Sequence, residues 1–521
     1  MGVFKAYDIR GVYNVDFDKK TAYKVGYFLP SLLNASFVAV GRDVRVSSDE
    51  IHNALVKGIT DSGADVYDLG LATTPMVYFA TTFLDASASV QITASHNPPK
   101  YNGLKISRKG ALPVGGETGL KDLEKLVNEG KVKVAEKKGQ VFDRSDVKDS
   151  YVEFLRNKVS DLSNLKISMD LSHGMANLVI KDVLKEYNDN IHYLYDHFDG
   201  TFPAHEPNPL EVENCKDLMK AVVEDNSDCG VIYDGDADRV MFIDEKGRFI
   251  QPDYITAVIG LYYSKSEKGN VLQDIRTSRS TTEYLEKLGF NVTTWKVGHA
   301  FAKLKIREIN GIFGGELAGH YYFRDFGNCD SGVLASLLVL SVVSNLKRNN
   351  RTLSSLIDEI IKYQNSGEVN FKLENKDDAI NALYQKYVVE EKANKVLDFD
   401  GYRIEFDSWW FNVRKSNTEP YLRIVLEAQT KEEMEKHLKD ISDIIHKFNW
   451  ALLGAQNCAP YFYLWSLGKI IFKTIATNAA MITGEEPNTI VTQLGNWAKL
   501  SLTKLIPIPS AADRPTIDVF L

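Results

Sequence analysis

Cysteine is scarce in this sequence. Its 521 residues include four, at positions 215, 229, 329 and 458, and no two of them form a C-x-x-C pair. That spacing argues against a dense disulfide framework. The first residues, MGVFKAYDIRGVYNVDF, also lack an apolar run of signal-peptide length. We therefore expect a reduced, cytoplasmic protein.

An excess of positive charge is absent as well. The 62 lysines and arginines are outnumbered by 70 aspartates and glutamates, which gives a formal net charge of -8 at pH 7. We therefore expect no nucleic-acid partner, whereas a small anion in a local basic pocket is compatible with this balance. With 44% hydrophobic and 25% charged residues, the chain has the composition of a globular protein with several cores.

Strand-like and helix-like segments alternate through most of the chain. β-branched runs occupy residues 37–43, 64–70, 89–95, 165–172, 229–236, 270–275 and 291–298, and amphipathic helical patterns such as 48–63 lie between several of them. This alternation predicts an α/β architecture built from repeated units, with breaks near residues 140, 250 and 370. After 370, two strand-like runs frame a loop and a helical pattern follows, which predicts a smaller α+β domain.

The segment QITASHNPPK places Ser95 and His96 directly after a strand-like run. Ligands gather at the carboxyl ends of strands in α/β proteins, so Ser95 is a candidate nucleophile. A serine beside an Asn-Pro pair is also typical of an ordinary turn. This segment alone does not decide between the two interpretations.

Three alternating carboxylates follow a second strand-like run, in YDGDADRV. Asp234, Asp236 and Asp238 would point the same way in extended backbone. Carboxylates crowded in this way repel one another unless a cation lies among them, and oxygen ligands suit magnesium or calcium. An EF-hand calcium loop shares the D-x-D-x-D spacing, but Arg239 stands where that loop needs glycine. We therefore expect a magnesium site, with a solvated acidic turn as the alternative.

Two further loops carry polar groups suited to a sugar phosphate. FGGELAGHYYF places Glu316 and His320 among glycines, which allow close approach to a polyhydroxylated ligand. VRKSNTEPYLR gathers a set of phosphate-binding groups, namely Arg414, Ser416, Asn417, Thr418 and Arg423. Each loop taken alone is also compatible with an ordinary surface turn.

In their order along the chain, these segments resemble the motifs of the α-D-phosphohexomutase superfamily, and most closely its phosphomannomutase/phosphoglucomutase branch. TASHNP is similar to the phosphoserine loop, DGDADR to the magnesium loop, GELAGH to the sugar-binding loop and RKSNTEP to the phosphate-binding loop. AYDIRG, GRDVRVSS, PNPL and KVGH match as well, and the resemblance covers about residues 1–448.

The resemblance implies three similar mixed α/β domains around a cleft, followed by a smaller α+β domain and a mainly helical C-terminal extension. The implied boundaries are a phosphoserine-bearing domain at 1–143, a magnesium-binding domain at 144–249, a sugar-recognition domain at 250–369, a phosphate-binding domain at 370–448 and an extension at 449–521. The implied hinge, about which the phosphate-binding domain closes over the substrate, lies near residue 370.

The resemblance also implies the reaction. Phosphorylated Ser95 transfers its phosphoryl group to a hexose 1- or 6-phosphate, giving a glucose or mannose 1,6-bisphosphate that reorients and returns the other phosphate. One Mg²⁺ per chain is held by Asp234, Asp236, Asp238 and an oxygen on Ser95. Proton transfer falls to Lys105, Arg10 and His299, without an assignment of acid and base, while His96 orients the serine loop.

Other residues then bind the substrate in its two orientations. Glu316 and His320 contact sugar hydroxyls, and Arg414, Ser416, Asn417, Thr418 and Arg423 hold the non-reacting phosphate. Arg239 adds positive charge beside the metal, and Lys296 and Arg279 line the cleft.

One position departs from the family pattern. Ala318 stands where the mannose/glucose branch usually has serine, two residues after the loop glutamate. Phosphoglucosamine mutase is therefore the alternative activity, and a non-catalytic sugar-phosphate sensor is the alternative from another class.

The last 73 residues, 449–521, lie outside the resemblance. They contain the aromatic run YFYLW and two helical patterns, but Pro460, Gly468, Lys469 and Lys473 interrupt the apolar stretch, so we expect no membrane-spanning helix. We expect a docking or homo-oligomerisation appendage, with interfacial membrane contact as the alternative.

Overall fold

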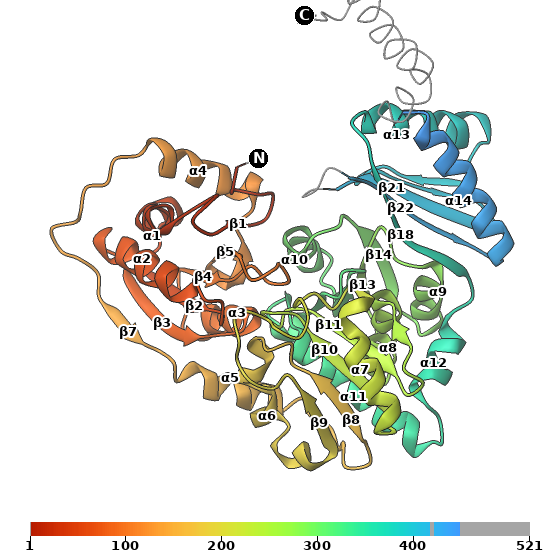
Figure 1. The fold of residues 1–521 in the computed structure, drawn as a ribbon, viewed down its shortest axis with the longest axis horizontal. Helices are drawn as coiled ribbons and strands as arrows, with labels where there is room; N and C mark the ends of the chain where they lie inside the picture. The colour runs from red at the N-terminus through yellow and green to blue at the C-terminus, as the bar shows by residue number, and fades with distance from the viewer. Residues whose placement is uncertain (1, 417–420, 449–521) are drawn as a thin grey trace, which may run out of the picture. The chain divides into compact units, whose positions relative to one another are not determined.

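The computed structural model describes residues 2–416 and 421–448 of the chain. Met1–Lys372 and Lys376–Ser442 belong to one compact unit, and the sites discussed below lie within it. The described residues of this unit contain four β-sheets, labelled by their strands in Figure 1. The predicted C-terminal extension at 449–521 lies outside the described residues. No helix among the described residues is both long enough and apolar enough to cross a bilayer.

The first sheet comprises β1 (Ile9–Val12), β2 (Phe37–Arg42), β3 (Asp65–Leu71), β4 (Ala88–Ile92), β5 (Tyr101–Arg108), β6 (Leu112–Pro113) and β7 (Val141–Asp143). Its order is β1-β5-β4-β2-β3-β7, with β6 paired to β5. The accompanying helices are α1 (Lys19–Leu33), α2 (Ser48–Asp61), α3 (Thr74–Phe83) and α4 (Leu120–Glu129). β4 is parallel to β2 and antiparallel to β5, so the loop between β4 and β5, which contains Ser95, lies at the carboxyl end of β4.

The second sheet has the order β12-β11-β10-β8-β9. Its strands are β8 (Ile167–Asp170), β9 (Ile191–Leu194), β10 (Cys229–Tyr233), β11 (Val240–Asp244) and β12 (Phe249–Ile250), and the helices α5 (Val147–Arg156), α6 (Ile180–Val183) and α7 (Lys216–Glu224) accompany them. β10 and β11 form an antiparallel pair. The turn between them holds the three aspartates.

The third sheet has the order β14-β13-β15-β16-β17. Its strands are β13 (Asn270–Asp274), β14 (Asn291–Trp295), β15 (Phe313–Gly315), β16 (Tyr321–Phe323) and β17 (Cys329–Asp330), and its helices are α8 (Pro252–Tyr263), α9 (Arg279–Lys287), α10 (His299–Glu308), α11 (Gly332–Arg348) and α12 (Leu353–Ile360). The loop between β15 and β16 carries Glu316 and His320.

The fourth sheet is antiparallel throughout, with the order β18-β22-β21-β20-β19. It comprises β18 (Gln364–Lys372), β19 (Lys395–Leu397), β20 (Tyr402–Glu405), β21 (Trp409–Lys415) and β22 (Tyr421–Ala428), with α13 (Lys376–Tyr384) and α14 (Lys431–His446). The predicted architecture of three α/β domains followed by an α+β domain is confirmed.

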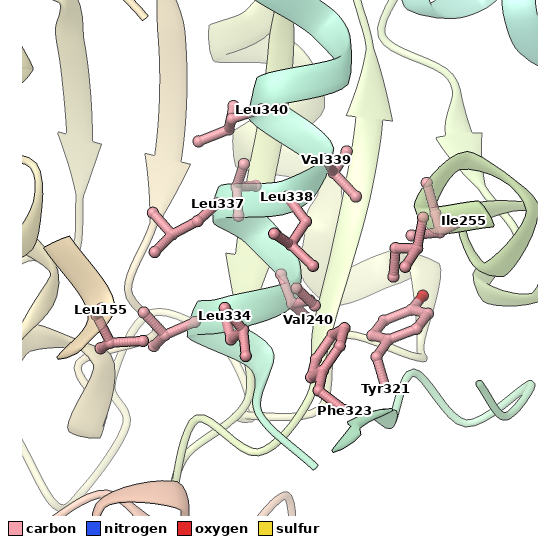
Figure 2. Close-up of a cluster of buried hydrophobic side chains, with 14 of the residues drawn as sticks. Leu155, Val240, Ile255, Tyr321, Phe323, Leu334, Leu337, Leu338, Val339 and Leu340 are labelled. Carbon is pink, nitrogen blue, oxygen red and sulfur yellow. The ribbon is translucent and has the colours of Figure 1, made fainter. Parts of the chain in front are cut away.

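Helix α11 joins the second and third sheets through a common hydrophobic core. Its sequence, GVLASLLVLSVVSNLKR, is apolar on nearly every side, and such a helix is stable only when it is surrounded by protein. Figure 2 shows Leu334 and Leu338 of α11 near Val240 of β11 and Phe323 of β16, and all four belong to one buried cluster. This shared core holds the aspartate turn and the Glu316–His320 loop in one structural block.

Candidate active site

Ser95 is held in a strained, buried loop. Its backbone has φ = 50°, in the left-handed region, and the residue is 1% exposed. The guanidinium group of Arg45 donates hydrogen bonds to the carbonyl oxygens of Ser95 (2.8 Å) and Asn97 (2.6 Å), and also to those of Pro98 and Tyr101. Positive φ at a non-glycine residue costs energy and persists where the surroundings enforce it, commonly at functional sites. The loop therefore presents the serine hydroxyl in one set position.

One of the three aspartates, Asp234 in the turn between β10 and β11, contacts this hydroxyl. Ser95 Oγ donates to Asp234 Oδ2 over 2.8 Å, and Thr74 Oγ1 donates to Asp236 Oδ2 over 2.5 Å. Carboxylate oxygens of Asp234, Asp236 and Asp238 lie within 4.8 Å of one another, and all three residues are buried. Burial and the charge of Asp236 raise the pKa of Asp234 well above its usual range. The cluster therefore favours a bound cation.

Lys105 provides part of the required positive charge. Its Nζ lies 2.7 Å from Asp236 Oδ2 and 2.5 Å from Asp238 Oδ2. Burial would lower the pKa of Lys105, but these two carboxylates outweigh that effect and raise it. Oδ1 of Asp236 and Oδ1 of Asp238 remain buried without a hydrogen-bond partner among the described residues. Unused, buried, anionic oxygens are the donors that Mg²⁺ prefers, so the residues present fit that ion.

His96 and Arg10 lie beside the serine. His96 Nδ1 is 3.3 Å from Ser95 Oγ, and desolvation together with nearby cations, Arg239 first among them, lowers the pKa of His96 well below its usual value. The imidazole is therefore neutral at pH 7. Arg10 donates to Asn97 Oδ1 over 2.7 Å and pairs with Asp8, so it contacts the same loop.

The loop between β15 and β16 is tied to the aspartate turn by His320. Arg239 Nε lies 3.0 Å from His320 Nε2, and the backbones of these two residues form an isolated antiparallel bridge. His320 Nδ1 lies 2.7 Å from Asp330 Oδ2, whose other oxygen is 2.7 Å from Lys303 Nζ. Since Arg239 is a donor only, His320 Nε2 accepts this hydrogen bond, which leaves the proton of a neutral ring on Nδ1.

Glu316 lies in the same loop and is enclosed. Its Oε1 accepts from the backbone N–H of Gly298 at 2.6 Å, and its Oε2 accepts from Tyr322 Oη at 2.8 Å. Burial raises the pKa of this carboxyl group. His299, at the start of α10, follows Gly298, and its pKa is lowered well below the usual value by desolvation and by Lys303.

Two predicted cleft residues, Lys296 and Arg279, make contacts outside the serine loop and the aspartate turn. Lys296 Nζ lies over the rings of Phe301 (5.6 Å) and Trp295 (6.0 Å). Arg279 donates to the carbonyl oxygens of Phe406 (2.9 Å) and Asp407 (3.0 Å), in the turn between β20 and β21. In this structure Arg279 therefore connects the third sheet to the fourth.

Arg414 and Arg423 of the predicted phosphate loop point to one acidic residue, Glu368 of β18. The nearest nitrogen–oxygen distances are 3.5 Å for Arg414 and 2.9 Å for Arg423. Ser416 ends the described part of this loop, and its N–H donates to the carbonyl of Tyr421. Asn417 and Thr418 lie outside the described residues.

The structure adds residues that the sequence argument did not assign. Arg45 lies inside the segment GRDVRVSS, and Arg276 lies three residues before Arg279. Spacing alone does not separate either arginine from its neighbours. No local sequence motif marks Thr74 or Asp330, because their contacts with Asp236 and His320 form only through the tertiary fold.

Comparison with known proteins is consistent with this geometry. Models of the phosphoglucomutase/phosphomannomutase family match at α/β/α domain I (residues 1–133), domain II (149–247), domain III (251–363) and the C-terminal domain (368–444). A curated phosphomannomutase of Methanocaldococcus jannaschii is 35% identical over 459 residues, covering 86% of this chain and 99% of the relative. One from Escherichia coli K12 is 36% identical, covering 82% of this chain and 94% of the relative.

A solved phosphoglucomutase/phosphomannomutase family protein from Burkholderia thailandensis has a similar structure. The TM-score is 0.77 at 27% identity, and the match covers 85% of this chain and 96% of that one. A structure described as a putative phosphomannomutase from Thermus thermophilus has the same fold, with a TM-score of 0.71 at 23% identity. With four domain models matched in order, this chain belongs to the phosphoglucomutase/phosphomannomutase family of phosphohexomutase enzymes.

Proposed function

We propose that this enzyme interconverts the 1-phosphate and 6-phosphate of mannose or glucose, with Ser95 as the phosphoryl carrier. The observation that carries the assignment to Ser95 is the 2.8 Å contact of its hydroxyl with Asp234, inside a cluster of three buried carboxylates. A serine held against a cation site is suited to accept and release a phosphoryl group, because the developing charge can be neutralised there.

The proposed cycle begins with phosphate on Ser95. A free hydroxyl of the bound hexose monophosphate attacks the phosphorus, the bond to Ser95 Oγ breaks, and the hydroxyl proton passes to a protein base. The resulting 1,6-bisphosphate reorients, and Ser95 Oγ attacks its other phosphate. The bond from that phosphorus to the sugar oxygen breaks, and the sugar oxygen takes the proton back from the protein base, which gives the isomeric monophosphate and restores the phosphoserine. The cycle consumes no water and releases no inorganic phosphate.

Asp234, Asp236, Asp238 and an oxygen on Ser95 would hold the magnesium ion, which when bound supplies positive charge to the transferring group. Lys105 and Arg239 add charge at the same place. For the proton, the proposed candidates are Lys105, Arg10 and His299. Arg10 contacts Asn97 of the serine loop, and Lys105 lies against Asp236 and Asp238. His96 is proposed to orient that loop, since its Nδ1 lies 3.3 Å from Ser95 Oγ.

The remaining site residues are proposed to bind substrate. Glu316 and His320 serve sugar hydroxyls, since their loop contacts the aspartate turn through Arg239. The non-reacting phosphate is assigned to Arg414, Ser416, Asn417, Thr418 and Arg423. Lys296 and Arg279 remain proposed cleft residues, although their contacts in this structure are with aromatic rings and with backbone carbonyls, respectively.

Ala318 bears on the choice of sugar. The loop of residues 316–320 has no hydroxyl side chain at that position, which leaves phosphoglucosamine mutase as the second candidate activity. Side-by-side turnover of mannose, glucose and glucosamine phosphates separates these activities.

The three described cysteines, Cys215, Cys229 and Cys329, are buried free thiols, which supports a reducing, cytoplasmic location.

Mass spectrometry of the purified full-length protein tests the proposal. A phosphate on Ser95 that exchanges with isotopically labelled hexose phosphate is expected of the mutase. A sugar-phosphate sensor would bind the ligand with Ser95 unmodified, and that result would reject the enzymatic assignment.

A further inference from the structure

Three guanidinium groups meet at a single carboxylate where the third and fourth sheets come together. Arg276 follows β13 of the third sheet, Arg414 lies on β21 and Arg423 on β22, and we call these three residues the arginine cluster. Their nearest nitrogens lie 3.4, 3.5 and 2.9 Å, respectively, from the carboxylate oxygens of Glu368 on β18. One acidic side chain therefore touches cations from two sheets.

The backbone of β18 is irregular where it carries this acid. The register between β18 and β22 shifts between Asn365 and Glu368, and Gly367 has φ = 66°. A β-bulge changes the direction in which the following side chain points, and glycine adopts such a φ without strain. The local irregularity thus directs Glu368 toward the arginine cluster.

Two members of the cluster need a counter-charge. Arg414 and Arg423 are direct cross-strand partners in the pairing of β21 with β22. Like charges directly opposite each other on a sheet are destabilising. Arg414 is also almost fully buried, and its Nε has no hydrogen-bond partner among the described residues. Glu368 contributes negative charge that lets these guanidinium groups stay close together.

We propose that Glu368 is a positioning residue, which holds the arginine cluster together so that its three guanidinium groups bind the non-reacting phosphate of the substrate as one site. This inference rests on the proposed function. Glu368 does not itself contact the phosphate, since both groups are anionic. Its contribution is to orient Arg414 and Arg423, which would otherwise repel one another. Arg276, which also pairs with Asp274 over 2.8 Å, extends the site to the third sheet.

Glu368→Gln tests this role because it removes the charge at nearly constant size. The Michaelis constant for hexose phosphates should rise about tenfold while kcat stays within about twofold, as expected when binding is lost equally from substrate and transition state. Calorimetric titration of the full-length protein with inorganic phosphate should show a similar loss of affinity. Glu368→Asp keeps the charge and should show a smaller loss, and it replaces the glutamine variant if that protein does not fold.

Asp377→Asn is the matched control, because it removes an exposed acid that pairs with Lys415 at the end of the same strand as Arg414. It should leave both constants unchanged. A lower Michaelis constant in Glu368→Gln would mean that the carboxylate competes with phosphate, and a lower melting temperature with unchanged affinities would mean a structural role only. Either result overturns the inference. If the wild-type enzyme shows no turnover, the proposed function fails, and the phosphate titration alone decides the role of Glu368.

Discussion

Ser95 and Asp234 are 139 positions apart in the sequence, yet the hydroxyl of one donates to the carboxylate of the other over 2.8 Å. Each lies in a loop that joins strands of a different sheet, so the contact exists only when the first two domains are assembled.

Ser95→Ala should abolish mutase turnover and leave hexose-phosphate binding intact. The variant loses the phosphoryl carrier but keeps the aspartates and the arginines, and loss of an obligatory nucleophile costs several orders of magnitude in rate. A coupled assay measures turnover, and calorimetry measures binding. The exposed Ser163 provides a control through Ser163→Ala. Residual turnover above about one hundredth of wild type would contradict the mechanism.

Asp234→Asn should stabilise the metal-free protein and weaken its binding of magnesium. At neutral pH, burial and the charge of Asp236 oppose ionisation of Asp234, so a neutral amide at this position removes the cost of burying an ionisable carboxyl group in the absence of a cation. We expect the melting temperature in EDTA to rise by about 2 °C or more. Titration with MgCl₂ alone should show reduced affinity. A lower melting temperature together with unchanged magnesium affinity would refute this account.

Stability should fall with rising pH because of Asp253, at the start of α8. Burial raises the pKa of this carboxyl group to about 7, against about 3.9 when unfolded. Between these values the folded protein binds more protons than the unfolded one, so the contribution is favourable below about pH 4 and is lost as the pH rises to about 7.

The loss is on the order of 4 kcal/mol. Asp253→Asn should flatten this part of the pH profile, as measured by denaturant unfolding from pH 4.5 to 7.5. The exposed Asp122 serves as the control site, and Asp122→Asn should keep the wild-type slope. Parallel profiles for wild type and Asp253→Asn would disprove the assignment.

Ala318→Ser should strengthen substrate binding by up to about 1.5 kcal/mol, the usual net value of one added hydrogen bond. The new hydroxyl would stand two residues from Glu316, in the loop assigned to the sugar. Michaelis constants for mannose, glucose and glucosamine phosphates measure the effect. If all three stay constant, the loop is not used for sugar recognition in the proposed way.

Truncation after Phe448 tests the role of residues 449–521. Because these residues carry no metal-binding or phosphate-binding pattern, activity per folded molecule should persist. Their apolar content predicts a change in oligomeric state or in thermal stability. Light scattering and a melting curve are the measurements. Unchanged results in both, or loss of catalysis in a folded protein, would exclude a docking role.

Local sequence patterns predicted most of the fold, because runs of β-branched residues mark the buried strands and the spacing of polar residues marks the loops. The runs around Val40, Ile92 and Val231 are buried strands as predicted, and the D-x-D-x-D spacing brings three carboxylates together. Partnerships across the fold could not be inferred in this way. Nothing in the sequence around Asp330 or Thr74 indicates that these residues face His320 and Asp236, since such contacts depend on how separate sheets pack.

The burial of α11 bears on how the protein unfolds. Because this helix fills a core shared by the second and third sheets, separating those domains would expose an apolar surface that neither can cover alone. The sequence segments 144–249 and 250–369 are therefore not independent folding units, and a fragment containing only one of them should aggregate. Amide hydrogens in β10, β11, β15 and α11 should accordingly exchange with solvent at a common slow rate, as one cooperative unit.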